Sequence, residues 1–246
     1  MTILIPMAGL SSRFRKAGFT LPKYMLYIKD KSLFRLAVES FERYFKTARF
    51  VFVAQKVFDT PLFIKDECEL MGLKDFEVVA LDGPTDGQAE TVSIGVERTG
   101  LQDEESLLIF NIDTFRPGYC FPETLSKSDG YLECFVGDGD NWSYAKTDDG
   151  TDKGLVVETA EKRRISDYCS TGLYWFRKTQ DFKKAYKLNG NKRYGTGKEL
   201  YVAPLYNFLI KDGKEIRVNI IPRSDVIFCG VPSEYEEYLT KEVESR

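Results

Sequence analysis

The sequence has 246 residues, of which 35 are basic, 38 are acidic and none is histidine, so its formal net charge is −3. At about 150 residues per domain, this length allows one large domain or a core with a smaller lobe. The slightly negative charge gives no reason to expect nucleic acid as a partner. The lack of histidine excludes Ser-His and Cys-His nucleophile pairs and histidine-based zinc sites, which leaves carboxylates, lysine, arginine and backbone amides for catalysis.

Five cysteines are scattered along the chain, and no two of them form a C-x-x-C pair. This pattern indicates neither a disulfide framework nor a zinc ribbon, so we expect reduced thiols in a cytoplasmic protein. No stretch approaches the length of a membrane span, about 20 apolar residues, and the apolar start is too short for a signal peptide. A membrane is therefore not an expected partner.

The first half of the chain alternates apolar runs with amphipathic stretches. Continuous apolar runs, typical of parallel strands buried on both faces, lie at residues 3–5, 50–54, 76–81 and 107–110. Between the first two, a helical stripe of apolar side chains consists of Phe34, Ala37, Val38, Phe41 and Phe45. Between the last two, Ala89, Val92 and Val96 repeat that spacing. Strands and helices therefore alternate, as in βαβ units whose ligand site lies beyond the carboxyl ends of the strands.

From about residue 115 the pattern changes to strand-like pieces separated by turns. These pieces lie at residues 131–136, 142–146, 154–159 and 171–176. They predict a mixed or antiparallel extension of the sheet. Helical patterns at 178–188 and 199–211, a strand at 216–220 and a last helix follow. Ser233 and Glu236, directly after Pro232, form a capping box that predicts the start of that helix.

A loop of small residues follows the first predicted strand. Gly9, Ser11 and Ser12 let backbone N–H groups approach phosphate oxygens, and Arg13 and Lys23 neutralise the phosphate charge. The segment therefore predicts a phosphate-binding loop. The local pattern alone is equally typical of an ordinary strand-to-helix turn with a solvated arginine.

The fourth apolar run leads directly into Asn111-Ile112-Asp113. Residues two apart in an extended segment point the same way, so Asn111 and Asp113 face one ligand together at the carboxyl end of the strand. One or two carboxylates, with water and phosphate oxygens, suit Mg²⁺. The alternative is a solvated loop aspartate.

The segment Ala8-Gly9-Leu10-Ser11-Ser12-Arg13-Phe14, followed by Pro22-Lys23, resembles the signature loop of the sugar nucleotidylyltransferases, or NDP-sugar pyrophosphorylases. Ser11 stands where the family has its second glycine, and a serine permits the same close backbone approach if its φ is negative. The resemblance implies an α/β fold of the Rossmann-like, GT-A type, with three α/β/α layers around a mostly parallel, mixed central sheet. It also implies one domain over 1–246, with a nucleotide-binding half at about 1–114 and an acceptor-binding half at about 115–246.

By this resemblance, two loops bind the nucleotide, the signature loop and the segment 83–91, which is similar to the family's nucleobase loop. The residues implied to bind the nucleotide are Ala8, Gly9, Ser11, Ser12, Gly87 and Gln88. Arg13 and Lys23 are the implied catalytic residues: Arg13 holds the phosphates, and Lys23 bridges the α-phosphate and the incoming phosphate. Judged without the resemblance, segment 83–91 is also typical of an ordinary strand-to-helix connection.

On the acceptor side, the segment from Gly154 to Glu161-Lys162 resembles the family's Gly-x-Val-x-x-x-x-Glu-Lys element. There the glutamate binds sugar hydroxyls and the lysine binds the substrate phosphate. Thr171 and Gly172 lie in a segment similar to the strand whose backbone meets the substrate.

The resemblance also implies Mg²⁺ as the cofactor, held by carboxylates of the protein. Asp113 corresponds to the retained acid of the family's Asp-x-Asp motif. Phe228 occupies the family's second acidic position, so the nearby Asp225 is our candidate for the second ligand.

The resemblance implies nucleotidylyl transfer, in which an NTP and a small phosphorylated acceptor give an NDP-linked product and pyrophosphate. The opening Ile-Pro-Met-Ala-Gly is most similar to short family members associated with capsule and surface polysaccharides. Two alternatives stay open. One is a GT-A glycosyltransferase, and the other is a catalytically degenerate, nucleotide-binding regulatory protein, because Ser11, Asn111 and Phe228 depart from the common pattern.

The nucleobase and the acceptor cannot be read from the sequence, although the polar segment 189–199 is typical of a substrate loop. The aromatic content of 14% fits an interface of a homo-oligomer and an aromatic core equally well.

Overall fold

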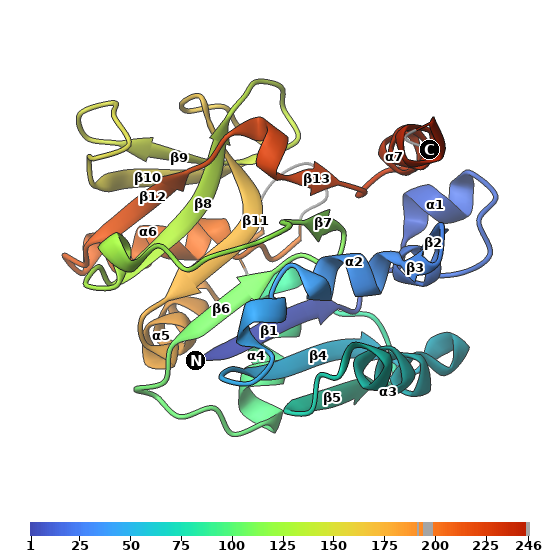
Figure 1. Ribbon diagram of the computed structural model, residues 1–246. Helices are drawn as coiled ribbons and strands as arrows, with labels where there is room; N and C mark the ends of the chain where they lie inside the picture. Colours follow the sequence, from blue (N-terminus) through green and yellow to red (C-terminus); the bar gives the residue numbers. More distant parts are fainter. Residues whose placement is uncertain (191, 194–198, 245–246) are drawn as a thin grey trace.

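The computed structural model describes residues 1–190, 192–193 and 199–244 (Figure 1). The strands are β1 (Thr2–Met7), β2 (Tyr27–Ile28), β3 (Lys31–Ser32), β4 (Arg49–Gln55), β5 (Phe76–Leu81), β6 (Leu107–Phe110), β7 (Thr114–Phe115), β8 (Gly130–Val136), β9 (Ser143–Thr147), β10 (Val156–Glu161), β11 (Tyr168–Phe176), β12 (Ile216–Ile220) and β13 (Ile227–Phe228). The α-helices are α1 (Ser12–Lys16), α2 (Leu33–Glu39), α3 (Thr60–Met71), α4 (Gln88–Arg98), α5 (Thr179–Asn189), α6 (Tyr206–Lys211) and α7 (Pro232–Glu244). Short 3-10 helices are η1 (Lys23–Met25), η2 (Glu42–Tyr44), η3 (Val57–Asp59), η4 (Glu123–Leu125), η5 (Ala203–Leu205) and η6 (Arg223–Asp225).

The described residues form one mixed sheet of nine strands in the order β10-β9-β11-β6-β1-β4-β5, with β8 between β11 and β12. Strands β6, β1, β4 and β5 run parallel to one another, whereas β11 is antiparallel to β6, β8 and β9. The predicted α/β fold with a mixed sheet and parallel core strands is therefore confirmed. Parallel strands end at one edge of the sheet, so the loops that follow them meet there.

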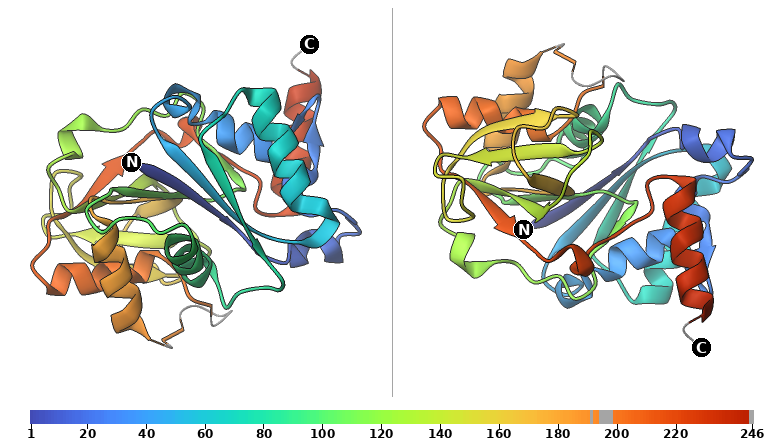
Figure 2. Two further views of the ribbon diagram at one scale, coloured as in Figure 1. Left: turned by 90° about the horizontal axis from the view of Figure 1, so that it is seen from below. Right: turned by 90° about the horizontal axis from the view of Figure 1, so that it is seen from above.

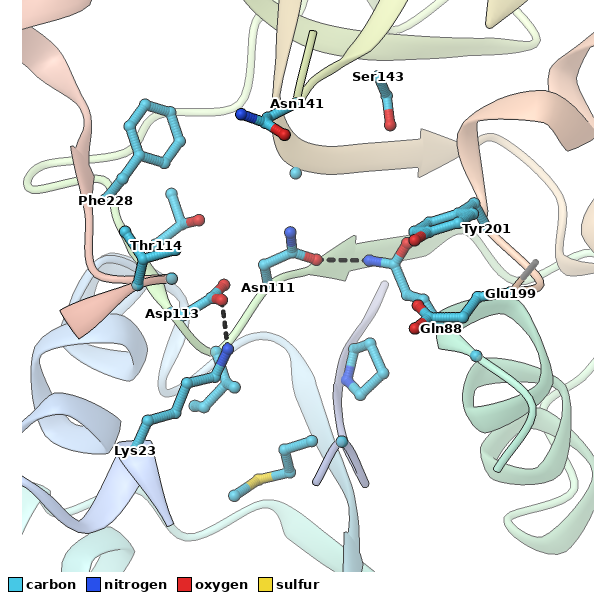
Figure 3. Close-up of a pocket in the computed structure, with 18 of the residues that line it drawn as sticks. Lys23, Gln88, Asn111, Asp113, Thr114, Asn141, Ser143, Glu199, Tyr201 and Phe228 are labelled. Atoms are coloured by element: carbon cyan, nitrogen blue, oxygen red, sulfur yellow. Dashed lines mark hydrogen bonds and ion pairs between the residues drawn. The ribbon is translucent and has the colours of Figure 1, made fainter. Parts of the chain in front are cut away.

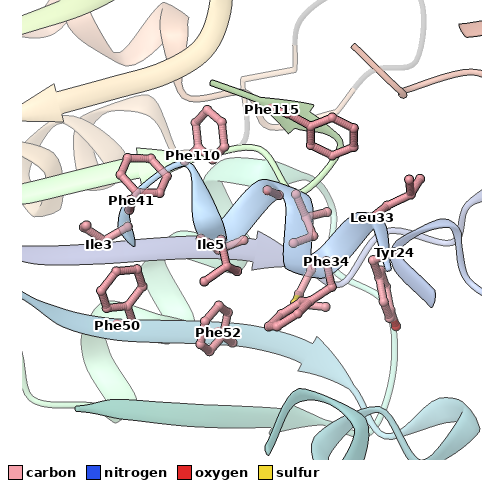
Figure 4. Close-up of a cluster of buried hydrophobic side chains, with 14 of the residues drawn as sticks. Ile3, Ile5, Tyr24, Leu33, Phe34, Phe41, Phe50, Phe52, Phe110 and Phe115 are labelled. Carbon is pink, nitrogen blue, oxygen red and sulfur yellow. The ribbon is translucent and has the colours of Figure 1, made fainter. Parts of the chain in front are cut away.

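Helices cover both faces of the sheet, as the two views in Figure 2 show. Because successive strand residues point to opposite faces, β1 contributes Ile3 and Ile5 to the core under α2 and α3 and Leu4 to the core under α4, α5 and α6. Aromatic side chains fill the first of these cores, where the rings of Phe34 and Phe52 lie 5.1 Å apart (Figure 4). This rigid, doubly covered sheet is the support on which the loops are held.

The strand expectations agree closely with the structure, and the helix expectations agree less well. Predicted segments 76–81, 107–110 and 216–220 coincide with β5, β6 and β12. The helix expected over 199–211 begins only at Ala203, as η5 followed by α6, because the backbone of Leu200 is hydrogen-bonded to Asp86 and Ala89 instead. Part of the segment 189–199, namely 191 and 194–198, lies outside the described residues. The structure also contains α1 and α3, which the sequence patterns did not predict.

The last helix begins at Pro232, two residues earlier than Glu234, where a capping box with Ser233 as its N-cap would start it. The N-terminal cap comes instead from Glu234 in the first turn, whose Oε2 accepts hydrogen bonds from the amides of Gly230 at 2.8 Å and Val231 at 3.1 Å. A proline is well tolerated at the first helical position because it has no N–H to leave unpaired. Within the described part of the chain, no helix combines the length and the apolar character needed to span a bilayer.

Candidate active site

A cleft of about 840 Å³ opens at the carboxyl ends of the parallel strands. Its walls are the loops that follow β1, β5 and β6, together with residues from β9, β10 and β11. The sequence-predicted residues that line it are Ala8, Gly9, Ser11, Ser12, Arg13, Lys23, Gly87, Gln88, Asp113, Glu161, Lys162, Thr171 and Gly172. Segments that are far apart in the sequence therefore converge on one cavity, large enough for a small-molecule ligand.

The loop after β1 is held in a tight, partly strained conformation. Ser11 has φ +50°, so the condition of a negative φ is not met, and the serine adopts the left-handed conformation that a glycine takes easily. This conformation costs about 1–2 kcal/mol in a residue with a Cβ. Interactions on both sides hold the loop: Ser11 Oγ accepts from the Lys23 amide at 3.3 Å, and the carbonyl of Ala8 accepts from Gln55 Nε2 at 2.5 Å.

Polar side chains after β6 face the cleft as predicted. Lys23 forms an ion pair with Asp113, and Gln88 donates a hydrogen bond to the side-chain oxygen of Asn111 (Figure 3). Asn111 packs against Gly172, where a Cβ would lie 2.3 Å from the Asn111 amide nitrogen. The glycine in β11 is therefore needed for the close approach of Asn111, which in turn orients Gln88.

Arg13 supplies a second cation at the cleft. It lies in α1 and is exposed. Within the described residues no carboxylate forms an ion pair with Arg13, so its guanidinium is free to bind an anion.

On the opposite side of the cleft, Glu161 is the last residue of β10 and Lys162 follows it directly. Glu161 is 8% exposed and accepts a hydrogen bond from the Ser143 hydroxyl, and burial raises the pKa of its carboxyl. Lys162 has φ +52°, and its Nζ donates to the Tyr201 hydroxyl at 2.6 Å. Thr171 is buried with its hydroxyl 3.3 Å from Glu133 Oε1, so its side chain supports β11 from behind the cleft.

Gly87 has a packing role that the sequence did not reveal. A Cβ at this position would lie 2.5 Å from the backbone nitrogen of Leu200. Leu200 N–H donates to the Asp86 carbonyl at 2.9 Å, and Ala89 N–H donates to the Leu200 carbonyl at 2.8 Å. The segment that contains Leu200 is therefore attached to the start of α4, beside Gln88.

The chain is similar along its whole length to the nucleoside-diphosphate-sugar pyrophosphorylase from Vibrio cholerae RC9. The two sequences are 47% identical, the structures superpose with a TM-score of 0.91, and the match covers 97% of this chain and 99% of that one. This chain belongs to the nucleoside-diphosphate-sugar pyrophosphorylase family. The predicted family and its nucleotidyltransferase activity are confirmed.

More distant members of the same fold include an inositol-1-phosphate CTP transferase from T. maritima, at 15% identity and a TM-score of 0.70, covering 98% of this chain and 95% of that one. A UDP-glucose pyrophosphorylase crystallised with UDP-glucose has 15% identity and a TM-score of 0.74, over 100% and 99% of the two chains. At this identity the likeness concerns the fold alone. No protein-family model and no curated protein matches the sequence.

Asp225, our candidate for the second metal ligand in this pyrophosphorylase, does not line the cleft. It lies in η6, where its carbonyl accepts from Arg116 at 3.3 Å and its carboxylate lies 4.0 Å from the same guanidinium. Phe228 does line the cleft, and it packs between Trp142, at 4.8 Å between ring centroids, and the Arg223 guanidinium, at 4.7 Å. The expectation that Asp225 assists Asp113 is therefore not supported, because the side chain is directed to Arg116.

The residues of the described chain still fit a divalent cation of the kind that family membership implies, with one protein carboxylate. They form no group of three His, Cys, Asp or Glu side chains arranged around a metal. Glu234 also lines the cleft, but both its hydrogen bonds cap α7. Asp113 would hold Mg²⁺ with water and substrate phosphate oxygens, which this ion accepts readily.

Several polar residues of the cleft were missed by the sequence analysis. They include Asn141, Ser143 and Tyr201, whereas Glu199 ends the segment 189–199 that the sequence predicted as a substrate loop. No spacing rule could select them, because their positions at the cleft depend on contacts between segments that are distant in the sequence. The high density of polar and aromatic residues around 199–201 was the one available signal.

Proposed function

We propose that this pyrophosphorylase condenses an NTP with a sugar phosphate or a related phosphomonoester, in the presence of Mg²⁺, for capsule or surface polysaccharide synthesis. The observation that carries the proposal is that Arg13 and Lys23 on one wall of the cleft, and Lys162 on the other, open onto a single cavity. Two phosphorylated ligands that must meet require cations on both sides of the meeting point. The opening motif that resembles the capsule-associated branch supports the biological setting.

The proposed reaction is an in-line displacement. An ionised oxygen of the acceptor phosphate attacks the α-phosphorus of the NTP, a new P–O bond forms, and the bond to the β-phosphate oxygen breaks to release pyrophosphate. The attacking oxygen is already deprotonated near neutral pH, so the reaction needs no general base, in agreement with a chain that has no histidine. Alignment and charge stabilisation then account for catalysis.

Each cation has a distinct part in this proposal. Arg13 binds the β- and γ-phosphates, and Lys23 contacts the α-phosphate where the two substrates meet. Lys162 holds the acceptor phosphate, and Glu161 accepts hydrogen bonds from acceptor hydroxyls. Asp113 would hold Mg²⁺, which screens phosphate charge when it is bound. Lys23 pairs with Asp113 in the structure, so the Lys23 ammonium becomes free to contact the α-phosphate when this carboxylate holds Mg²⁺ instead.

The remaining predicted residues surround the nucleotide and the acceptor in this proposal. Ala8, Gly9, Ser11 and Ser12 offer backbone and hydroxyl groups to the base, ribose and triphosphate. Gln88, at the start of α4, binds the base, and Gly87 makes room for Leu200 beside it.

The experiment that tests this function has two steps. First, CTP, UTP, dTTP, GTP and ATP are compared by thermal shift, each with Mg²⁺ or with EDTA, since a ligand raises stability by RT ln(1 + [L]/Kd). Second, the NTP with the largest shift is incubated with a panel of phosphorylated hexoses, polyols and amino alcohols, and pyrophosphate release is measured. We expect one metal-dependent shift and release with one acceptor class. Binding without release for every acceptor would contradict the proposal and favour a regulatory protein.

A further inference from the structure

Lys162, the proposed ligand of the acceptor phosphate, is held by Tyr201 on the opposite wall of the cleft. Its Nζ donates to the Tyr201 hydroxyl at 2.6 Å and lies 4.9 Å from the centre of the tyrosine ring. The backbone of Lys162 is restrained as well, because its φ is +52° and its amide donates to the Trp142 carbonyl at 2.9 Å. A long, flexible side chain is thereby fixed at both ends.

Tyr201 is itself anchored to the nucleotide side of the cleft. Its neighbour Leu200 makes backbone hydrogen bonds to both Asp86 and Ala89. Gly87 has no Cβ, so the two segments can pack directly against each other. Arg193 adds an ion pair with Asp86 at 2.6 Å. The segment that carries the tyrosine is therefore bonded to the start of α4, whereas Lys162 directly follows β10.

The Tyr201 hydroxyl can accept from Lys162 only while its own proton points elsewhere. Glu199 lies beside Tyr201 in the cleft (Figure 3). Burial, with the charges of Glu199 and Glu161, raises the pKa of the phenol, so it stays protonated at neutral pH. The protonated phenol oxygen keeps its lone pairs, and with one of them it accepts the hydrogen bond from the Lys162 ammonium.

We propose that Tyr201 is a positioning residue that aims the Lys162 ammonium at the acceptor phosphate and links this ammonium to the nucleobase loop. The inference rests on the proposed role of Lys162. Removing the hydroxyl releases the ammonium into several rotamers, so a phosphate bound at Lys162 loses a preorganised partner. The nucleotide contacts of the signature loop, which lie on other elements, stay unchanged.

The test compares Tyr201→Phe, which removes only the hydroxyl, with Tyr168→Phe. The Tyr168 hydroxyl makes one comparable hydrogen bond, to the Gly150 carbonyl at 3.1 Å, and does not line the cleft. Acylation of Lys162 by an amine reagent is followed by mass spectrometry at increasing inorganic phosphate. We expect phosphate to protect Lys162 in the wild type and in Tyr168→Phe, and protection in Tyr201→Phe to need about tenfold more phosphate.

In the same variants, KM is measured for the acceptor found in the panel and for the NTP. Tyr201→Phe should raise the acceptor KM by about tenfold and leave the NTP KM within about twofold. Equal protection in Tyr201→Phe and wild type, or an unchanged or lower acceptor KM, would overturn the positioning role. If the wild type shows no turnover, the proposed function fails, and the phosphate protection of Lys162 still decides the role of Tyr201.

Discussion

Gly172 is the position where the packing of β11 against the cleft can be tested most directly. The residue has φ +89°, and a Cβ would lie 2.3 Å from Nδ2 and 2.7 Å from Cγ of Asn111. Gly172→Ala therefore combines backbone strain of about 1–2 kcal/mol with overpacking of about 1–3 kcal/mol. We expect the free energy of unfolding to fall by about 2–5 kcal/mol, since the clash involves the first atoms of a short side chain.

The matched control is Gly118→Ala. Gly118 has φ +70° but nothing lies within 4 Å of its Cβ position, so this variant carries the backbone strain alone. Urea unfolding of both variants isolates the cost of the clash. Their free energies of unfolding should differ by about 1–3 kcal/mol. The displaced Asn111 also loses its bond from Gln88, so kcat/KM for the NTP should fall in Gly172→Ala by about tenfold. Equal losses of stability in the two variants would refute the packing argument.

Three further predictions concern charge. Arg13→Ala and Lys23→Ala should each lower kcat by about 10²–10³ with unchanged thermal stability, and near-normal turnover in both would contradict their roles. Asp113→Asn should abolish the Mg²⁺-dependent part of the NTP thermal shift, whereas Asp225→Asn should keep it; equal shifts in the two variants would remove Asp113 as a ligand. Burial raises the pKa of the Glu133 carboxyl, so the folded state binds its proton more tightly than the unfolded state. Stability from this group is present at low pH and lost as the pH rises through the raised pKa, so Glu133→Gln should gain stability relative to wild type in urea unfolding between about pH 4 and pH 7. A constant difference across that range would show that Glu133 does not titrate there.

The strands of the central sheet were predictable because their burial leaves a mark on composition. The run at 107–110 is apolar at every position, and β6 indeed has all four residues buried between two helical layers. Helix α4 was predictable for a similar reason, since Ala89, Val92 and Val96 face one core. In contrast, α1 has five residues and one buried side chain, too few to produce a periodic pattern.

The sequence by itself determined the fold class, the family resemblance and most of the residues that line the cleft, because these follow from local composition and from motifs at strand ends. Tertiary structure alone decided which of them act together. Asp225 is close to the expected metal position in sequence, but its carboxylate lies against Arg116. Tyr201 meets Lys162 only because the backbone of Leu200 is bonded to the loop before α4. Contacts of this kind join residues far apart in the chain, and local patterns carry no record of them because they depend on how the loops pack after the sheet has formed.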